Sequence, residues 1–159
     1  DLGLTGVELS REGVTLTPFR ASTAACAMLK SHPLAQLETI CPEDLHGERL
    51  VALTQRHARR GQLDKVLTNA KSKPKLVAEA STSFAAVDLV REGLGITVIN
   101  PFPVAQYRSE DIRFLPFASQ ITYRSYFVTP KQCLTPAIAR AFIRHLKLHT
   151  LKTPFISKA

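Results

Sequence analysis

Three adjacent hydroxyl side chains, Ser81, Thr82 and Ser83, follow a short apolar run and precede a helical pattern. A hydroxyl at that place accepts a hydrogen bond from a free backbone N–H of the first helical turn. The same N–H groups, together with the positive end of the helix dipole, bind anions at the N-termini of helices. The cluster therefore predicts either a helix cap alone or a cap that also binds an anionic ligand, and the spacing leaves both interpretations open.

A second candidate group follows a predicted strand at residues 50–53. This loop begins with Thr54, and its cationic or potentially cationic side chains are Arg56, His57, Arg59 and Arg60. Arginine has a planar fork that grips a carboxylate through two parallel hydrogen bonds, as the recognition of a small organic acid requires. We select Arg60 as the candidate for such a contact, with a solvated surface arginine as the alternative.

Other chemistries find little support in the sequence. His145 and His149 are four residues apart on a predicted helix, as zinc ligands often are, but no glutamate lies between them to act as a general base. The cysteines, Cys26, Cys41 and Cys133, form no Cys-X-X-Cys pair, and no Gly-X-Ser-X-Gly nucleophile motif occurs. We therefore predict a binding protein without a metal or cofactor, and not an enzyme.

The hydroxyl cluster belongs to a predicted strand-helix-strand unit. Leu76–Ala78 form the first strand, and apolar residues at three- and four-residue spacing over 84–94 indicate an amphipathic helix. Gly93 is predicted to end this helix in the left-handed conformation, with Leu94 folding back on the last turn. A β-branched run over residues 96–99 forms the second strand, which should pair in parallel with the first and be buried on both faces.

The remaining elements are shorter or less regular. Residues 22–35 are predicted to cross between two lobes. They begin with small and polar residues, and Pro33 holds the preceding His32 extended. Residues 151–159 have no pattern and are predicted to be a disordered tail. The other predicted elements are a buried strand at 1–6, an edge strand at 14–20, a short helix at 42–45, a helix at 63–70, strands at 112–116 and 123–129, and a helix from 136 to 146.

The composition excludes several classes of protein. The chain has 159 residues, 45% of them hydrophobic, which is enough for a core, and no apolar run reaches the ~18 residues of a membrane span. The net charge is +8, but Lys and Arg are scattered and lack the aromatic interleaving of a single-strand nucleic-acid binder. The isolated cysteines favour a reducing cytoplasm. Because the chain starts at Asp1, on a strand-like segment, we expect a fragment of a longer protein.

From Asp1 to about Leu146, the chain resembles the effector-sensing domain of LysR-type transcriptional regulators. The segments that carry the resemblance are 1–4, 32–35, 42–45 with 50–53, and above all 89–101. Residues 47–67 and 79–102 look closest to the branch that senses basic amino acids and opines. The resemblance implies an α/β, two-lobed, periplasmic-binding-protein-like (type 2) fold. Lobe one, incomplete, would comprise residues 1–22 and 103–150, and lobe two residues 23–102.

This resemblance also implies a sensor that holds a small effector, an amino acid or opine-like carboxylate, in a cleft between the lobes. Arg60 and Ser81 to Ser83 would bind the effector carboxylate, Thr54 would face the same cleft, and Glu79 would bind a cationic end. The full-length regulator would be a cytoplasmic homodimer or homotetramer. It would contact DNA only through a winged helix-turn-helix that precedes Asp1.

Two other classes of protein remain as alternatives. An extracytoplasmic solute-binding protein of a transporter shares the expected fold. The sequence upstream of Asp1 separates it from a regulator, because a secretion signal and a helix-turn-helix differ plainly. A small-molecule enzyme on a similar fold ranks third, since no nucleophile or metal motif supports it. The sequence leaves open the effector, the promoter, and whether the regulator activates or represses.

Overall fold

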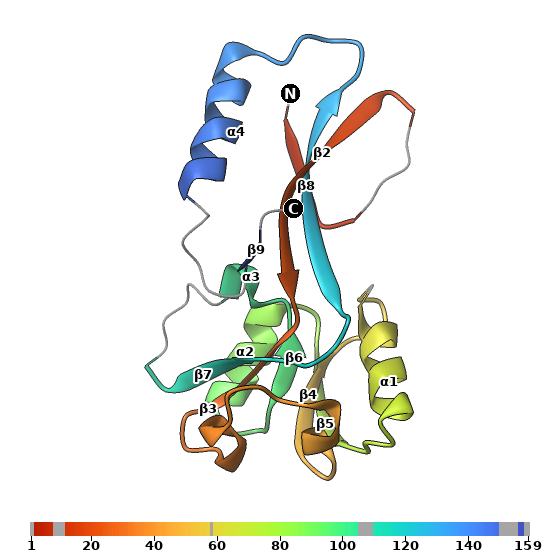
Figure 1. Cartoon of the computed structure of the whole chain (residues 1–159), viewed down its shortest axis with the longest axis vertical. Helices are drawn as coiled ribbons and strands as arrows, with labels where there is room; N and C mark the ends of the chain where they lie inside the picture. Colours follow the sequence, from red (N-terminus) through yellow and green to blue (C-terminus); the bar gives the residue numbers. More distant parts are fainter. Residues whose placement is uncertain (1, 8–11, 58, 105–109, 150–155, 158–159) are drawn as a thin grey trace. The chain divides into compact units, whose positions relative to one another are not determined.

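The computed structural model describes residues 2–7, 12–57, 59–104, 110–149 and 156–157. The chain divides into two compact units, one made of Asp1–Ser22 with Thr122–Ala159 and the other of Thr23–Ile121. Figure 1 shows the strands and helices of both units. Each unit has its own sheet.

The first unit is a four-stranded sheet with one helix. Its strands follow the order β1-β8-β2-β9, and its elements are β1 (Gly3–Thr5), β2 (Val14–Thr23), β8 (Thr122–Pro130), β9 (Ile156–Ser157) and α4 (Ala137–His149). β1 pairs with β8 at the edge of this sheet, and its Leu4 side chain is 56% exposed. The predicted strand at residues 1–6 is present, but its predicted burial is wrong, because Gly3 and Leu4 are exposed to solvent.

The end of the chain contributes to this sheet. β9 pairs antiparallel with the end of β2, with Ser157 opposite Ala21 and Ile156 opposite Ser22. A sheet edge presents unpaired N–H and C=O groups, which a passing segment can satisfy. The predicted disordered tail is therefore wrong for Ile156–Ser157, and the rest of residues 151–159 lies outside the described residues.

The second unit is a mixed sheet. Its strands are β3 (Ala25–Leu29), β4 (Arg49–Leu53), β5 (Lys75–Ala80), β6 (Thr97–Ile99) and β7 (Ile112–Pro116). β3 lies between β6 and β7 and is antiparallel to both, whereas β4 and β5 are parallel. The Ile96 N–H donates to the Arg49 carbonyl and the Val51 N–H to the Ile96 carbonyl, both at 2.8 Å. These two bonds join β4 to the entrance of β6, which gives the order β5-β4-β6-β3-β7.

Helices connect and cover these strands. They are α1 (Arg60–Asn69), α2 (Ser83–Arg91), the short α3 (Pro101–Val104), and two 3-10 turns at Pro33–Gln36 and Pro42–Leu45. α2 buries Val87 and Val90 in a core shared with Ala27 of β3, Val51 of β4 and Ile99 of β6. The predicted amphipathic helix is thus present, and its apolar stripe faces the sheet. None of the described helices is long and apolar enough to cross a membrane.

Three predictions about this unit are wrong. The predicted strands at 76–78 and 96–99 are not neighbours, because β4, buried along Leu50–Leu53, lies between them and bonds to both sides. Residues 22–27 were predicted to be small and polar without a strand, yet they contain the start of the buried strand β3, although the chain does pass from the first unit to the second between Ser22 and Thr23. Residues 103–121 were assigned to lobe one, yet they include β7, whose pairing with β3 places it in the second unit.

The end of α2 follows the sequence prediction. Gly93 has a φ of 78°, its N–H donates to the Val90 carbonyl at 2.9 Å, and the Leu94 N–H donates to the Leu89 carbonyl at 3.2 Å. Together these bonds form a Schellman motif. At Gly95 (φ 154°), an added Cβ would lie 2.1 Å from the carbonyl oxygen of Arg49, so glycine lets β6 begin this close to β4.

Candidate functional site

The predicted hydroxyl groups meet at one edge of the sheet. β4 and β5 are parallel and in register at Leu53 and Ala80, so both strands end at the same edge. Thr54 directly follows β4, and its N–H donates to the Ala80 carbonyl at 3.0 Å. Ser81 directly follows β5. We call Thr54, Ser81, Thr82 and Ser83 the hydroxyl edge. Parallel strands present ligand sites at such carboxyl ends.

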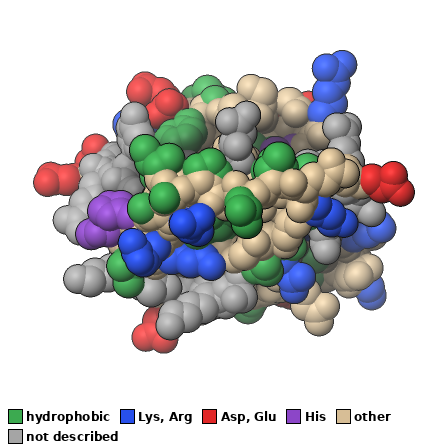
Figure 2. Space-filling model, turned by 90° about the horizontal axis from the view of Figure 1, so that it is seen from above, with side chains coloured by type: hydrophobic (Ala, Val, Ile, Leu, Met, Phe, Trp, Pro, Cys, Tyr) green, Lys and Arg blue, Asp and Glu red, His purple; other side chains and the backbone are tan. Residues whose placement is uncertain are grey.

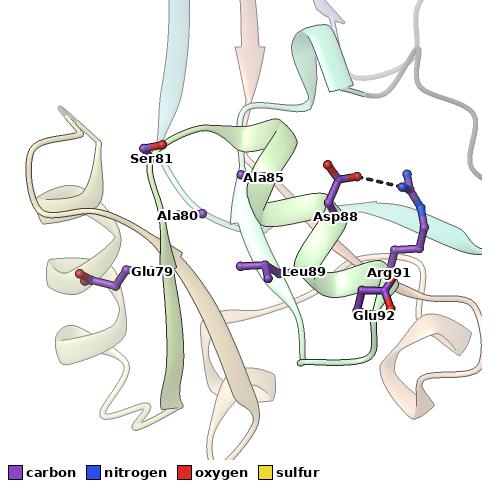
Figure 3. A pocket seen from close by; sticks show the side chains of 8 residues that line it. All are labelled: Glu79, Ala80, Ser81, Ala85, Asp88, Leu89, Arg91 and Glu92. Atoms are coloured by element: carbon purple, nitrogen blue, oxygen red, sulfur yellow. Dashed lines mark hydrogen bonds and ion pairs between the residues drawn. The ribbon is translucent and has the colours of Figure 1, made fainter.

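Thr82 caps α2. Its backbone is extended (φ −137°, ψ 157°), and its hydroxyl oxygen accepts a 3.2 Å hydrogen bond from the Ala85 N–H. The capping interpretation is therefore correct for Thr82. Ser83 is the first residue of α2, and Ser81 is exposed at the end of β5, where Figure 3 shows its side chain beside the start of the helix. Ser81 and Ser83 thus flank the capping residue in sequence.

The loop from β4 to α1 is folded tightly against this edge. The His57 N–H donates to the Thr54 carbonyl at 2.9 Å, and the Arg60 N–H donates to the His57 carbonyl at 3.0 Å. The Nδ1 atom of His57 accepts a hydrogen bond from the Arg59 N–H at 3.5 Å. Burial and the neighbouring Arg59 charge lower the pKa of His57. His57 is therefore a neutral imidazole near neutral pH.

Arg60 lies beneath the hydroxyl edge, and its side chain is 8% exposed. Its Nη1 donates to the Leu53 carbonyl at 2.5 Å and to Glu79 Oε1 at 2.6 Å, and its Nε donates to Asp64 Oδ1 at 2.9 Å. Burial disfavours the Arg60 charge, but the bonds to Glu79 and Asp64 outweigh burial and raise the pKa of Arg60. The guanidinium is charged and held on two sides by the protein.

This geometry bears on the roles expected for Arg60 and Glu79. A carboxylate binds bidentately either to Nε with Nη2 or to Nη1 with Nη2. Because Nε and Nη1 are already bonded to Asp64, Glu79 and Leu53, each of these two pairs has one donor committed to the protein. The sequence suggested Arg60 for the anionic end of an effector and Glu79 for the cationic end. In the structure, these two side chains bind each other.

A shallow groove of about 660 Å³ runs between β5 and α2. Its lining residues are Glu79, Ala80, Ser81, Ala85, Asp88, Leu89, Arg91 and Glu92. Three of these are acidic, but Figure 3 shows that the Glu79 side chain points toward α1, away from Asp88, which binds Arg91 at 2.8 Å. The acidic groups thus do not converge on one point in the groove.

Metal and nucleophile chemistry gains no support from the described residues. His145 and His149 stack with ring centroids 4.1 Å apart on α4, but no third ligand joins them, and no cluster of three or more His, Cys, Asp or Glu side chains occurs in the described part of the chain. Cys26 is buried, and burial followed by the Glu48 charge raises its pKa. Its thiol is therefore inert as a nucleophile near neutral pH.

The positive charge is distributed over the chain rather than collected at the hydroxyl edge. The net charge is +8, and Figure 2 shows Lys and Arg side chains next to hydrophobic ones on one face of the molecule. At the hydroxyl edge itself, one guanidinium, Arg60, lies between two carboxylates, Asp64 and Glu79. Those three side chains carry one excess negative charge, which attracts a cation, while Arg56 and Arg59 in the adjoining loop add positive charge.

Sequence comparison assigns the chain to a known group of proteins. The family described as the LysR substrate binding domain matches residues 1–150. The transcriptional activator protein LysR of Escherichia coli (strain K12) is 26% identical over 147 residues, which cover 92% of this chain and 47% of LysR. The octopine catabolism/uptake operon regulatory protein OccR of Rhizobium meliloti is 29% identical over 118 residues, 74% of this chain and 38% of OccR. The chain spans about half the length, or less, of these relatives.

Structure comparison gives the same fold. The regulatory domain of CcmR from Synechocystis PCC6803, in complex with 2-PG, matches with a TM-score of 0.73 and 17% identity, over 96% of this chain and 74% of that domain. Other matching effector-binding domains hold shikimate and benzoate. At this level of identity the match shows the fold. It confirms the predicted α/β, periplasmic-binding-protein-like type 2 fold.

Proposed function

The chain belongs to the LysR substrate-binding domain family and is an effector-binding domain of a LysR-type transcriptional regulator; we propose that its effector is an amino acid or opine-like carboxylate bound at the hydroxyl edge. The domain is a sensor and not an enzyme. Because the chain belongs to this family, the alternative that it is a transporter's solute-binding protein is no longer needed. Small-molecule effectors are bound by other domains of this fold, as the complexes with 2-PG, shikimate and benzoate show.

The observation that carries the proposal is the convergence of the hydroxyl edge on the N-terminus of α2. Register between β4 and β5 brings Thr54 beside Ser81, and Thr82 and Ser83 open the helix. The positive end of the helix dipole and neutral hydroxyl donors together stabilise a carboxylate without a cationic side chain. The anionic end of the proposed effector therefore lies over the first turn of α2.

The charge beside this edge supports a cationic second end for the effector. The Glu79 side chain is 39% exposed, and Asp64, 44% exposed, shares the single guanidinium of Arg60 with it. The excess carboxylate favours an ammonium or guanidinium group. A basic amino acid or an opine formed from one carries both ends, and the relative OccR is named for an octopine operon.

In the full-length regulator, we propose that effector binding is passed to DNA by a change in subunit arrangement. The effector can shift that equilibrium only as far as it prefers one arrangement over the other. Self-association as a homodimer or homotetramer, DNA contact through a segment outside this chain, and a cytoplasmic location are parts of the same proposal. They follow from the role of a transcriptional regulator, which must reach DNA.

A thermal-shift screen of the full-length regulator tests the effector class. The panel is L-lysine, L-arginine, L-ornithine, octopine, and simple dicarboxylates and aromatic acids as the competing class. A ligand present at 100 times its dissociation constant adds about 2.7 kcal/mol to the stability of the folded state. We expect a basic amino acid or octopine to raise the melting temperature. Stabilisation by dicarboxylates or aromatic acids alone would reject the proposed class.

Two substitutions then locate the site with the compound that binds. Ser81→Ala removes one hydroxyl from the edge and should weaken binding by about 0.5–1.5 kcal/mol, the value of a neutral hydrogen bond. Thr68→Ala is the matched control, because Thr68 is exposed at the other end of α1, where its hydroxyl donates to the Asp64 carbonyl. Equal affinities for wild type and Ser81→Ala would remove Ser81 from the proposed site.

A further inference from the structure

Arg60 connects three elements at the base of the hydroxyl edge. Its bonds reach the Leu53 carbonyl, directly before Thr54, the Glu79 carboxylate, two residues before Ser81, and Asp64 on α1. We infer that Arg60 is a positioning residue for the proposed effector site: it holds the carboxyl ends of β4 and β5 together and does not itself grip the effector carboxylate. The part of this inference that concerns effector binding rests on the proposed function. The part that concerns the two strand ends does not.

The position of β5 explains why such a connection is needed. Among the described strands, β5 pairs with β4, and its Leu76 and Val77 side chains are 51% and 39% exposed. The ladder between the two strands also shifts register between Leu50 and Val51. An edge strand is paired on one side only, and its ladder with β4 is regular from the Val51–Ala78 pair to the Leu53–Ala80 pair. At that end Arg60 adds one charge-assisted bond to each strand, buried at the Leu53 carbonyl and part-buried at Glu79.

Arginine is the residue type that suits this task. Its rigid fork directs several N–H groups in fixed directions, so one side chain can bond a carbonyl and two carboxylates at once. Lysine has a compact charge on a flexible stem and cannot reproduce that geometry. A positioning role therefore requires the guanidinium, whereas a simple electrostatic contact with an effector would keep much of its strength with lysine.

The two possible roles of Arg60, positioning residue or ligand of the effector, predict opposite changes in effector affinity when the Asp64 charge is removed. If Arg60 were the ligand of the effector carboxylate, Asp64 and Glu79 would compete with the effector for it. Removing the Asp64 charge would then free Nε and tighten binding. If Arg60 is a positioning residue, removing the Asp64 charge loosens the Arg60 side chain and lowers effector affinity.

Hydrogen exchange of the full-length regulator without ligand tests the geometry. The measurement needs mass spectrometry with fragmentation that separates single amides. In Arg60→Lys, exchange at the Thr54 amide, which bonds to Ala80, should accelerate about tenfold, as expected for loss of a buried bond. Exchange at the Val51 amide in the middle of β4 should change little, whereas general destabilisation would accelerate both amides.

The matched control is Arg91→Ala, which removes an exposed ion pair with Asp88 on α2 and should leave both amides unchanged. If Arg60→Lys does not fold, Glu79→Gln weakens one of the same bonds and should show a smaller acceleration at Thr54. Unchanged exchange at Thr54 relative to the Arg91→Ala control, or equal acceleration at Thr54 and Val51, would overturn the inference.

Calorimetry with L-lysine and octopine tests the role in binding. Arg60→Lys should weaken binding by about tenfold, and Asp64→Asn should weaken it too. Tighter binding in Asp64→Asn, by about tenfold or more, would assign Arg60 to the effector itself and overturn the positioning role. If neither probe binds the wild type, the proposed effector class fails. In that case the exchange at Thr54 still decides whether Arg60 holds the strand ends.

Discussion

His57 makes the stability of the loop between β4 and α1 depend on pH. It is half-buried, and burial, followed by repulsion from Arg59, lowers its pKa below the ordinary value. In the unfolded chain the ordinary value of about 6.5 returns, so below that pH the unfolded state binds a proton more readily than the folded state. The stabilising contribution of neutral His57 is therefore complete above about pH 6.5 and is lost as the pH falls toward the folded pKa.

Replacing His57 removes this dependence. Between about pH 7.5 and about pH 5.5, we expect the melting temperature of the wild type to fall more than that of His57→Gln, because glutamine does not titrate. His145→Gln, on the exposed surface of α4, is the control and should behave like the wild type. If the melting temperatures of His57→Gln and the wild type fall by the same amount across this range, folding does not lower the pKa of His57.

Single residues could be predicted from the sequence where their partners are local. The cap at Thr82 bonds to Ala85, three residues away, and the sequence spacing indicated it. The Arg60–Asp64 bond is an i,i+4 pair on α1, and it was missed because this helix was predicted to begin only at residue 63. The Arg60–Glu79 pair could not be predicted, since 19 residues separate the two and only the pairing of β4 with β5 brings them together.

At the scale of elements, α1 and α2 end in the same way with different residues. After α1, the Lys71 N–H donates to the Thr68 carbonyl at 3.0 Å and the Ser72 N–H donates to the Leu67 carbonyl at 2.9 Å. Lys71, at φ 53°, thus occupies the position that Gly93 holds after α2. A side chain in this left-handed conformation costs about 1–2 kcal/mol, which glycine avoids at some entropic cost in the unfolded chain.

Exchanging the residue types at these two positions should have opposite effects. Lys71→Gly should stabilise the domain by about 0.5–1 kcal/mol, and Gly93→Ala should destabilise it by about 1 kcal/mol. An added Cβ at Gly93 meets nothing within 4 Å, so that loss comes from the backbone alone. Denaturant unfolding measures both changes. Lys71→Ala is the control for loss of the lysine side chain, and a Lys71→Gly variant no more stable than this control would contradict the argument.

The elements that the sequence predicted well have strong local signals. The amphipathic pattern and terminal glycine of α2, and the β-branched run of β6, needed no tertiary context. β3 was missed because Ala25, Cys26 and Ala27 have neither high strand propensity nor alternation. In the structure these small side chains are fully buried, and Ala27 packs in the core with α2. Close packing here favours small side chains, which strand propensity alone does not predict in a strand.

For the whole molecule, the sequence resemblance predicted the fold and the family, and both are confirmed. It did not predict the division of the chain correctly at residues 103–121. Their sequence is irregular before β7, and a strand pattern such as that of Ile112–Pro116 does not say which sheet it joins. Strand pairing between distant segments is a property of the complete sheet, so local periodicity cannot assign it.

The last prediction concerns DNA and the positive charge of the whole chain. A helix-turn-helix needs two consecutive helices joined by a short turn. Along the described part of the chain, a strand separates each α-helix from the next. The net charge of +8 is scattered, and scattered Lys and Arg side chains contact phosphates, which carry no sequence information. We therefore expect the 159-residue chain to bind DNA weakly and without sequence preference.

Fluorescence anisotropy with two labelled duplexes of equal length and unrelated sequence measures this binding. Affinity should be equal for both duplexes and should fall steeply between about 50 and 200 mM salt, because each neutralised phosphate releases counterions. The full-length regulator with its own operator is the positive control and should keep its preference at the higher salt concentration. A preference of the 159-residue chain for one duplex that persists at about 200 mM salt would show base contacts made by this chain, and DNA recognition would then not be confined to a segment outside it.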